Sequence, residues 1–176
     1  LHPGRLAIAY AVEQGGRREA CVPGTRLVTS AVNAALAGGM CAHADETDDS
    51  HQPAFFHPGC AIVPAAWAMG ERAHASGRDL LRAVVLGYEV GARVSLTLGA
   101  MAFHQRGHSS HTFGALFGAS AAAGRARAAS AVAAGTACGA GCGWGRLRST
   151  YRQGPACFFA WALASLAAWA IWWRDW

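Results

Sequence analysis

The sequence predicts an all-α fold built as a helical bundle, and composition, patterning and length predict it together. Hydrophobic residues make up 53% of the 176 residues, and the 22 glycines accompany a large excess of alanine. Such small residues suit close packing between helices better than a β-sandwich. No segment alternates apolar and polar residues for long, so we expect few strands. The length fits a single domain that can bury a core.

Three segments in the first part of the chain carry this prediction. Residues 5–14 (RLAIAYAVEQ) place apolar side chains at helical spacing and run into Gly15-Gly16, a typical C-terminal signal. Residues 20–28 (ACVPGTRLV) indicate a loop or a short extended link. Ser30 can then cap a helix of small residues that ends at His43.

Three more helices are expected further along. The first covers residues 64–75, with Pro64 in its first turn, where a missing N–H costs little. Ser76-Gly77 separates it from a long amphipathic helix over residues 79–98. Residues 112–127 form a glycine- and alanine-rich helix that can approach its neighbours closely.

The composition changes abruptly near Cys142, so we divide the chain into residues 1–141 and a divergent apolar tail, residues 142–176. Six of the seven tryptophans lie from Trp144 onward, and residues 156–173 carry no charge. A shift of reading frame, a packed core helix and a short membrane segment all remain open for this tail. The abrupt change favours the first, and we do not expect a membrane partner.

Acids and histidines crowd together between Ala42 and Gly59 (AHADETDDSHQPAFFHPG). The acids are Asp45, Glu46, Asp48 and Asp49, and the histidines are His43, His51 and His57. Only 14% of the chain is charged, so this cluster stands out. Neighbouring carboxylates and imidazoles perturb one another's pKa values, as proton transfer requires. The alternative is a solvated loop whose acids cap helices.

Charge and cysteine usage limit the partners and the compartment. The net charge of +5 comes entirely from arginine, because the chain contains no lysine. These arginines are scattered rather than interleaved with aromatic residues, so no nucleic-acid partner is expected. The six cysteines form no CxxC pair and no signal peptide precedes them. Reduced thiols and a cytoplasmic location are therefore expected.

Three segments resemble the MmgE/PrpD family, which includes 2-methylcitrate dehydratase, cis-aconitate decarboxylase and carboxylate epimerases. They are AHADETDDSHQPAFFHPGCAIVPAAWAMGE, SGRDLLRAVVLGYEVGARV and GHSSHTFGALFGASAAA, in family order. The resemblance covers about residues 5–140. It implies that residues 1–141 are part of the family's helical domain without its α/β lid domain, as a fragment of a longer enzyme.

The resemblance also implies an activity. Family members are lyases, either dehydratases or decarboxylases, that abstract a proton next to a carboxylate of a small di- or tricarboxylate such as 2-methylcitrate or cis-aconitate. A carboxylate epimerase or isomerase, and a catalytically inactive fragment, are the alternatives. Family members resemble homodimers, so we expect a homo-oligomer, and no cofactor is implied.

Matching the family motif residue by residue gives the candidate site. The catalytic residues implied are Glu46, Ser50, His57 and His108, and we assign substrate binding to Asp48, Asp49, His51 and His104. His104 and His111 flank His108 at helical spacings and are alternatives to it. An active member is also expected to carry a lysine and a second-domain tyrosine, neither of which has a counterpart here. We therefore expect the chain by itself to be nearly inactive.

Other residues in the sequence have simpler interpretations. A metal site from His43, Asp45, Asp48 and His51 is chemically possible, but the family is not known to require one, so we expect no metal. His43 and His74 are expected to be structural, and Tyr88 and Trp67 to lie in the core. We expect the acidic loop and residues 104–112 to converge on one cleft.

Overall fold

A computed structural model describes residues 1–137, and for residues 130–137 it describes the helix without its side chains. The expected all-α class is confirmed in this part of the chain. Its elements are α1 (His2–Gln14), β1 (Ala20–Cys21), β2 (Val28–Thr29), α2 (Ala31–Ala42), the 3-10 turn η1 (Gln52–Ala54), α3 (Gly59–Arg72), α4 (Gly77–Thr97), α5 (Ala100–Gln105) and α6 (Ser110–Ala137). The predicted tail, residues 142–176, lies outside the described residues.

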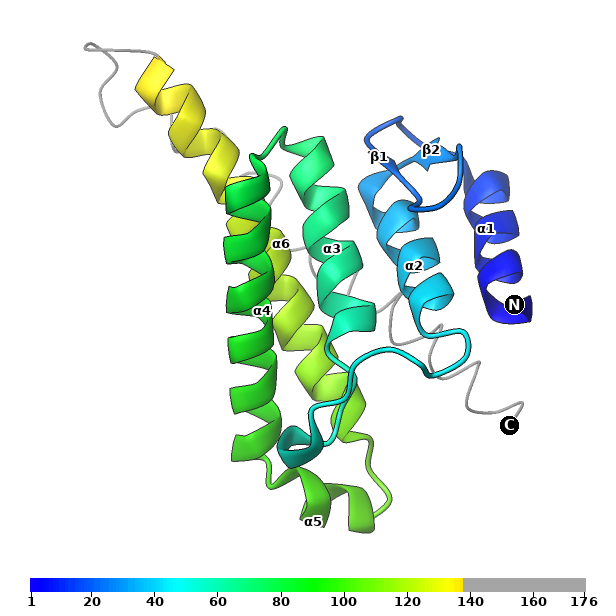
Figure 1. Cartoon of the computed structure of the whole chain (residues 1–176), viewed down its shortest axis with the longest axis vertical. Helices are drawn as coiled ribbons and strands as arrows, with labels where there is room; N and C mark the ends of the chain where they lie inside the picture. The colour runs from blue at the N-terminus through cyan, green and yellow to red at the C-terminus, as the bar shows by residue number, and fades with distance from the viewer. Residues whose placement is uncertain (138–176) are drawn as a thin grey trace.

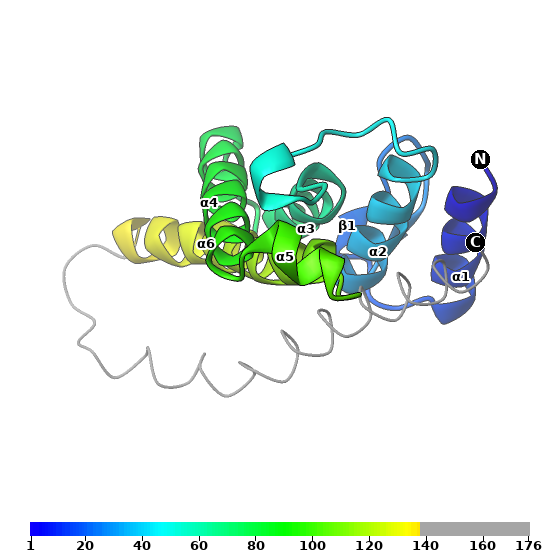
Figure 2. The ribbon, with the colours of Figure 1, turned by 90° about the horizontal axis from the view of Figure 1, so that it is seen from below.

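Helices α1 to α4 stand side by side in chain order, and α6 crosses behind α3 and α4 (Figure 1). Helix α5 closes the lower end of the α4–α6 pair, beside η1. Seen from below, the loop between α2 and α3 runs past the ends of both helices (Figure 2). None of the helices in the described part is both long and apolar enough to cross a membrane.

The first half of the chain packs around α2. Ser30 caps this helix as predicted, because its side-chain oxygen accepts a hydrogen bond from the backbone N–H of Asn33. The segment predicted as a loop or extended link forms a short hairpin, in which Ala20 pairs with Thr29 and Cys21 with Val28. Val22 follows β1 and is fully buried, so it fixes the hairpin to the core between α1 and α2.

Helix α3 begins at Gly59, five residues before the predicted start, and Pro64 therefore lies inside it. A proline there cannot donate to the carbonyl four residues earlier, that of Cys60. That carbonyl lies against α2, since a Cβ added at Gly39 would be only 2.7 Å from it. The proline signal was thus misread as a helix start. Trp67, predicted to be in the core, is 39% exposed.

Glycines let α4 and α6 approach until their backbones touch. A Cβ added at Gly91 of α4 would lie 2.7 Å from the carbonyl oxygen of Gly114 in α6. A Cβ added at Gly118 of α6 would lie 2.7 Å from the carbonyl oxygen of Gly87. Ile62 of α3 packs against this second contact. We call these four glycines the glycine notch.

The notch makes a stability test possible within one helix. Gly91→Ala places a methyl group against the Gly114 backbone, which cannot move without separating the helices. We expect it to lower the free energy of unfolding by about 1–3 kcal/mol, the usual cost of overpacking. Gly77→Ala is the matched control, because a Cβ there meets nothing within 4 Å, and it should be neutral or stabilising. Urea titration measures both, and equal effects would contradict the close approach.

Candidate functional site

The acidic loop joins α2 to α3 and is folded by its own side chains. His51 pairs with Phe56 in an isolated β-bridge, and its ring Nδ1 accepts a hydrogen bond from the backbone N–H of Ala54. Phe55 ends η1 with φ at 51°, in the left-handed region that non-glycine residues rarely adopt. The next side chain, Phe56, is 2% exposed and enters the core. The loop is therefore an ordered scaffold for the polar groups beside it.

Asp49 ties this loop to two helices. Its Oδ1 accepts a hydrogen bond from the backbone N–H of Gly59, at the start of α3, at 2.8 Å. Its Oδ2 accepts one from the hydroxyl of Tyr88 in α4, also at 2.8 Å. Burial and the Asp49 carboxylate raise the pKa of Tyr88, so its hydroxyl remains a donor. These contacts give Asp49 a structural role, and its predicted substrate contact stays a prediction.

His57 has one ring nitrogen fixed and the other available. Its Nδ1 lies 2.9 Å from the carbonyl oxygen of Asp49. A carbonyl can only accept, so Nδ1 carries the hydrogen and Nε2 holds the lone pair in the neutral ring. Ser50 Oγ lies 3.3 Å from Nδ1, and Asp48 Oδ1 lies 3.7 Å from it. The loop thus places two of the predicted catalytic residues, His57 and Ser50, side by side.

The histidine that faces His57 across the site is His111, in the first turn of α6. The two rings are stacked, with centroids 5.3 Å apart and planes at 23°. The His43 ring lies 5.1 Å from His57 on another side. Burial and the neighbouring His57, His43 and His104 lower the pKa of His111 to about 4. His111 is therefore neutral near pH 7 and can both donate and accept hydrogen bonds.

The two other predicted histidines of residues 104–112, His104 and His108, each contact a phenylalanine ring. His108 follows α5, and its ring stacks on Phe103 with centroids 4.7 Å apart. His104 packs on Phe55, with ring centroids 4.6 Å apart. The structure thus brings the acidic loop and residues 104–112 together at His104 and His111. The roles assigned to His108, His104 and His51 stay predictions.

Of Glu46, predicted as catalytic, and Asp48, predicted to bind substrate, Asp48 is the one whose carboxylate contacts an imidazole. Its Oδ1 accepts a hydrogen bond from His43 Nδ1 at 2.9 Å. Glu46 is exposed, its φ is 54°, and its backbone N–H donates to the carbonyl oxygen of His43. Asp48, rather than Glu46, thus holds the carboxylate position beside the imidazoles, and a catalytic role for Glu46 stays a prediction.

Sequence reasoning gave too little weight to three contributors, His111, Tyr88 and Cys60. His111 was noted only as an alternative to His108. It lies in the first turn of α6, and its ring there reaches His57 in the loop before α3. Tyr88 was read as a core residue. Cys60 follows the His-Pro-Gly segment directly, and burial, with the nearby Asp48 and Asp49, raises its pKa. The position of Cys60, directly after the predicted catalytic His57 and its Pro-Gly turn, could have indicated that its thiol lies near the site.

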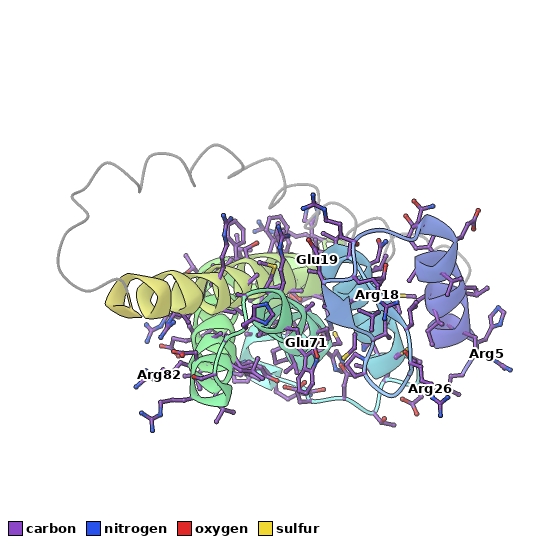
Figure 3. All side chains as sticks on the ribbon, turned by 90° about the horizontal axis from the view of Figure 1, so that it is seen from above. Arg5, Arg18, Glu19, Arg26, Glu71 and Arg82 are labelled. Atoms are coloured by element: carbon purple, nitrogen blue, oxygen red, sulfur yellow. The ribbon has the colours of Figure 1, made fainter. Side chains whose placement is uncertain are left out.

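The arginine ion pairs of the described residues do not include the acids of the loop. They involve Glu19, Asp79 and Glu89. Figure 3 shows Arg5 and Arg26 at the α1 side of the molecule and Arg82 on α4.

A cavity of about 470 Å³ lies between the hairpin and α3 and shares no residue with the histidine group. Arg18, Glu19 and Glu71 gather on that side of the molecule (Figure 3). Both Glu71 oxygens already accept hydrogen bonds from Cys21, from its N–H and its thiol. Because Glu71 and Glu19 already accept hydrogen bonds within the protein, this cavity is a weaker candidate for a catalytic site than the acidic loop.

Comparison with known proteins decides the family. The sequence model of the MmgE/PrpD N-terminal domain matches residues 1–172. The chain belongs to the MmgE/PrpD family. It is also similar to the cis-aconitate decarboxylase-like protein oryM of Aspergillus oryzae, with 36% identity over 90 residues. That match covers 47% of this chain and 19% of oryM, so the chain spans well under two thirds of the length of this relative.

The shifted pKa of His111 predicts a pH dependence of stability. In the unfolded chain its pKa returns to about 6.5, whereas in the fold it is about 4. Between these values the unfolded state binds more protons, so stability falls as the pH falls through this window. His111→Gln removes this contribution, on the order of 1–3 kcal/mol. Urea titrations at several pH values should show a shallower pH slope in the variant, and identical slopes would contradict the assignment.

Proposed function

We propose that this chain supplies the proton-transfer half of an MmgE/PrpD lyase that acts on a small di- or tricarboxylate. The observation that carries the proposal is the fixed tautomer of His57. Its Nδ1 donates to the Asp49 carbonyl, which leaves Nε2 free to take a proton from carbon. Support also comes from the family itself and from the printed name of oryM, a cis-aconitate decarboxylase-like protein.

The neighbouring groups suit the charge that this reaction develops. Removing a proton next to a carboxylate builds negative charge, which preorganised hydrogen-bond donors stabilise. The Ser50 hydroxyl lies beside His57 and is exposed, so it can donate to a substrate carboxylate. His111 is neutral, so it can donate without repelling a protonated His57 as a cation would. Dehydration or decarboxylation of 2-methylcitrate-like or cis-aconitate-like substrates is the reaction class we favour.

Two other functions use the same groups. An epimerase or isomerase would return the proton to another face or carbon, with His57 and His111 as the acid–base pair. A catalytically inactive chain is favoured by the lack of lysine in the sequence, since loss of one charge-stabilising group costs roughly 10²–10³ in rate. Binding without turnover distinguishes this last case from the first two.

We further propose a cytoplasmic homo-oligomer. Three cysteines in the described part, Cys21, Cys41 and Cys60, are free thiols, which suits a reducing compartment. Leu81 and Val85 lie one turn apart on α4 and are 68% and 69% exposed. Apolar side chains in such a row are suited to cover by a second subunit.

Ligand titration of the full chain tests the proposal. cis-Aconitate and 2-methylcitrate should shift the ring resonances of His57 and His111 in NMR spectra. Ser50→Ala and His57→Gln should each weaken this binding roughly tenfold, the effect of one lost hydrogen bond of about 1.4 kcal/mol. His2→Gln, an exposed histidine on α1, should bind as the parent chain does.

Turnover is then measured as exchange of the substrate's carbon-bound hydrogen for deuterium in heavy water. The proposal expects slow exchange that His57→Gln abolishes. Binding without exchange favours the inactive alternative. Equal binding by the parent chain, Ser50→Ala and His57→Gln would contradict the assignment of this loop as the substrate site.

A further inference from the structure

Three side chains of different chemistry, those of His43, Asp48 and Cys60, lie close together beside the stacked rings of His57 and His111. A ring nitrogen of His43, a carboxylate oxygen of Asp48 and the sulfur of Cys60 all lie within 4.8 Å of one another. They come from the end of α2, from the acidic loop and from the first turn of α3. Nitrogen, oxygen and thiolate sulfur at this spacing form the kind of donor set that binds zinc.

Asp48 gives a second and independent indication of a ligand. Its side chain is only 10% exposed, and one oxygen, Oδ1, accepts a hydrogen bond from His43. The other oxygen, Oδ2, is buried and has no hydrogen-bond partner among the described residues. An unpartnered buried carboxylate oxygen costs free energy, which a bound cation offsets.

The surrounding contacts hold the three donors in place. The Cys60 thiol donates to the carbonyl oxygen of His57 at 3.3 Å, so its sulfur faces the loop. Asp49 holds Gly59, the residue before Cys60, through its backbone N–H. The arginine ion pairs of the described part involve other acids, so no guanidinium among them competes for Asp48.

We propose that His43, Asp48 and Cys60 form a binding site for a divalent transition-metal ion, with Zn²⁺ as the preferred occupant. Three protein ligands leave one position of a tetrahedral ion open, as in catalytic zinc sites. On binding, the Cys60 thiol releases its proton to solvent, and His43 stays neutral by carrying its hydrogen on the ring nitrogen away from the ion. The site does not depend on the proposed carboxylate reaction. The set considered from the sequence was His43, Asp45, Asp48 and His51, and no metal was expected because the family is not known to require one. In the fold, His43 and Asp48 are joined by Cys60.

Cobalt titration of the full chain under reducing conditions tests this site. Co²⁺ bound to a thiolate gives a charge-transfer band in the near ultraviolet, and tetrahedral coordination gives intense visible bands. We expect both to saturate at one ion per chain and to disappear when Zn²⁺ is added in competition. Absence of the charge-transfer band in the parent chain overturns the proposal.

Variants identify the ligands. Cys60→Ser should abolish the charge-transfer band, and Asp48→Asn and His43→Gln should each weaken binding at least about 10- to 100-fold, the loss typical even of an outer-shell partner. The matched controls are Cys41→Ser, whose thiol lies against Gly4 of α1, and Asp45→Asn, whose carboxylate is exposed and contacts Thr47. Both should bind as the parent does. A band that survives in Cys60→Ser shows that another cysteine is the ligand and overturns the proposal.

X-ray absorption of the zinc-loaded parent chain identifies the ligand atoms without a variant, so it tests the proposal even if a variant fails to fold. The proposal expects one sulfur at about 2.3 Å, with the remaining ligands nitrogen or oxygen at about 2.0–2.2 Å. A shell without sulfur, or with two or more, overturns it. Because these measurements read the ion directly, their result is separate from the outcome of the carboxylate titration.

Discussion

The position of the site depends on one side chain, Phe56, seated in the glycine notch. A Cβ added at Gly114 would lie 2.9 Å from two ring carbons of Phe56, and one added at Gly91 would lie 3.2 Å from a third. The ring therefore occupies space that only glycine leaves open on both helices. Because Phe56 is held there, its neighbour His57 is fixed relative to α6. The close packing of α4 and α6 around Phe56 therefore also determines where His57 lies.

The electrostatics of the site follow from this packing. His111 is brought against His57 and away from water, which lowers its pKa to about 4 and keeps it neutral. Asp48 and Asp49 lie beside the histidines, and each is held by a partner of its own, His43 for Asp48 and Tyr88 for Asp49. The result is a neutral imidazole, that of His111, stacked on a second histidine beside two carboxylates. That arrangement suits proton transfer at His57 and metal binding at His43, Asp48 and Cys60.

The sequence predicts the helices well because their signals are local. Ser30 caps α2 as predicted, since a cap needs only the residues of one turn. Ser76, predicted only as a break between two helices, caps α4 in the same way. It predicts the start of α3 badly, because Pro64 is a reliable signal only at a helix start and here lies inside the helix. The loop was predicted as the candidate site from its crowded acids and histidines, and its residue roles came from the family resemblance. Which histidine faces it could not be predicted, because His104, His108 and His111 share one short segment and tertiary packing chooses among them.

One measurement tests this account most directly: the nuclear Overhauser contacts of the His57 ring in the isotopically labelled chain. The stacked rings, with centroids 5.3 Å apart, predict cross-peaks between His57 and His111. They also predict that Phe56→Leu, which empties part of the notch, weakens those cross-peaks while the helices remain. Cross-peaks from His57 to His108 instead, or contacts with His111 that Phe56→Leu leaves unchanged, would contradict the account.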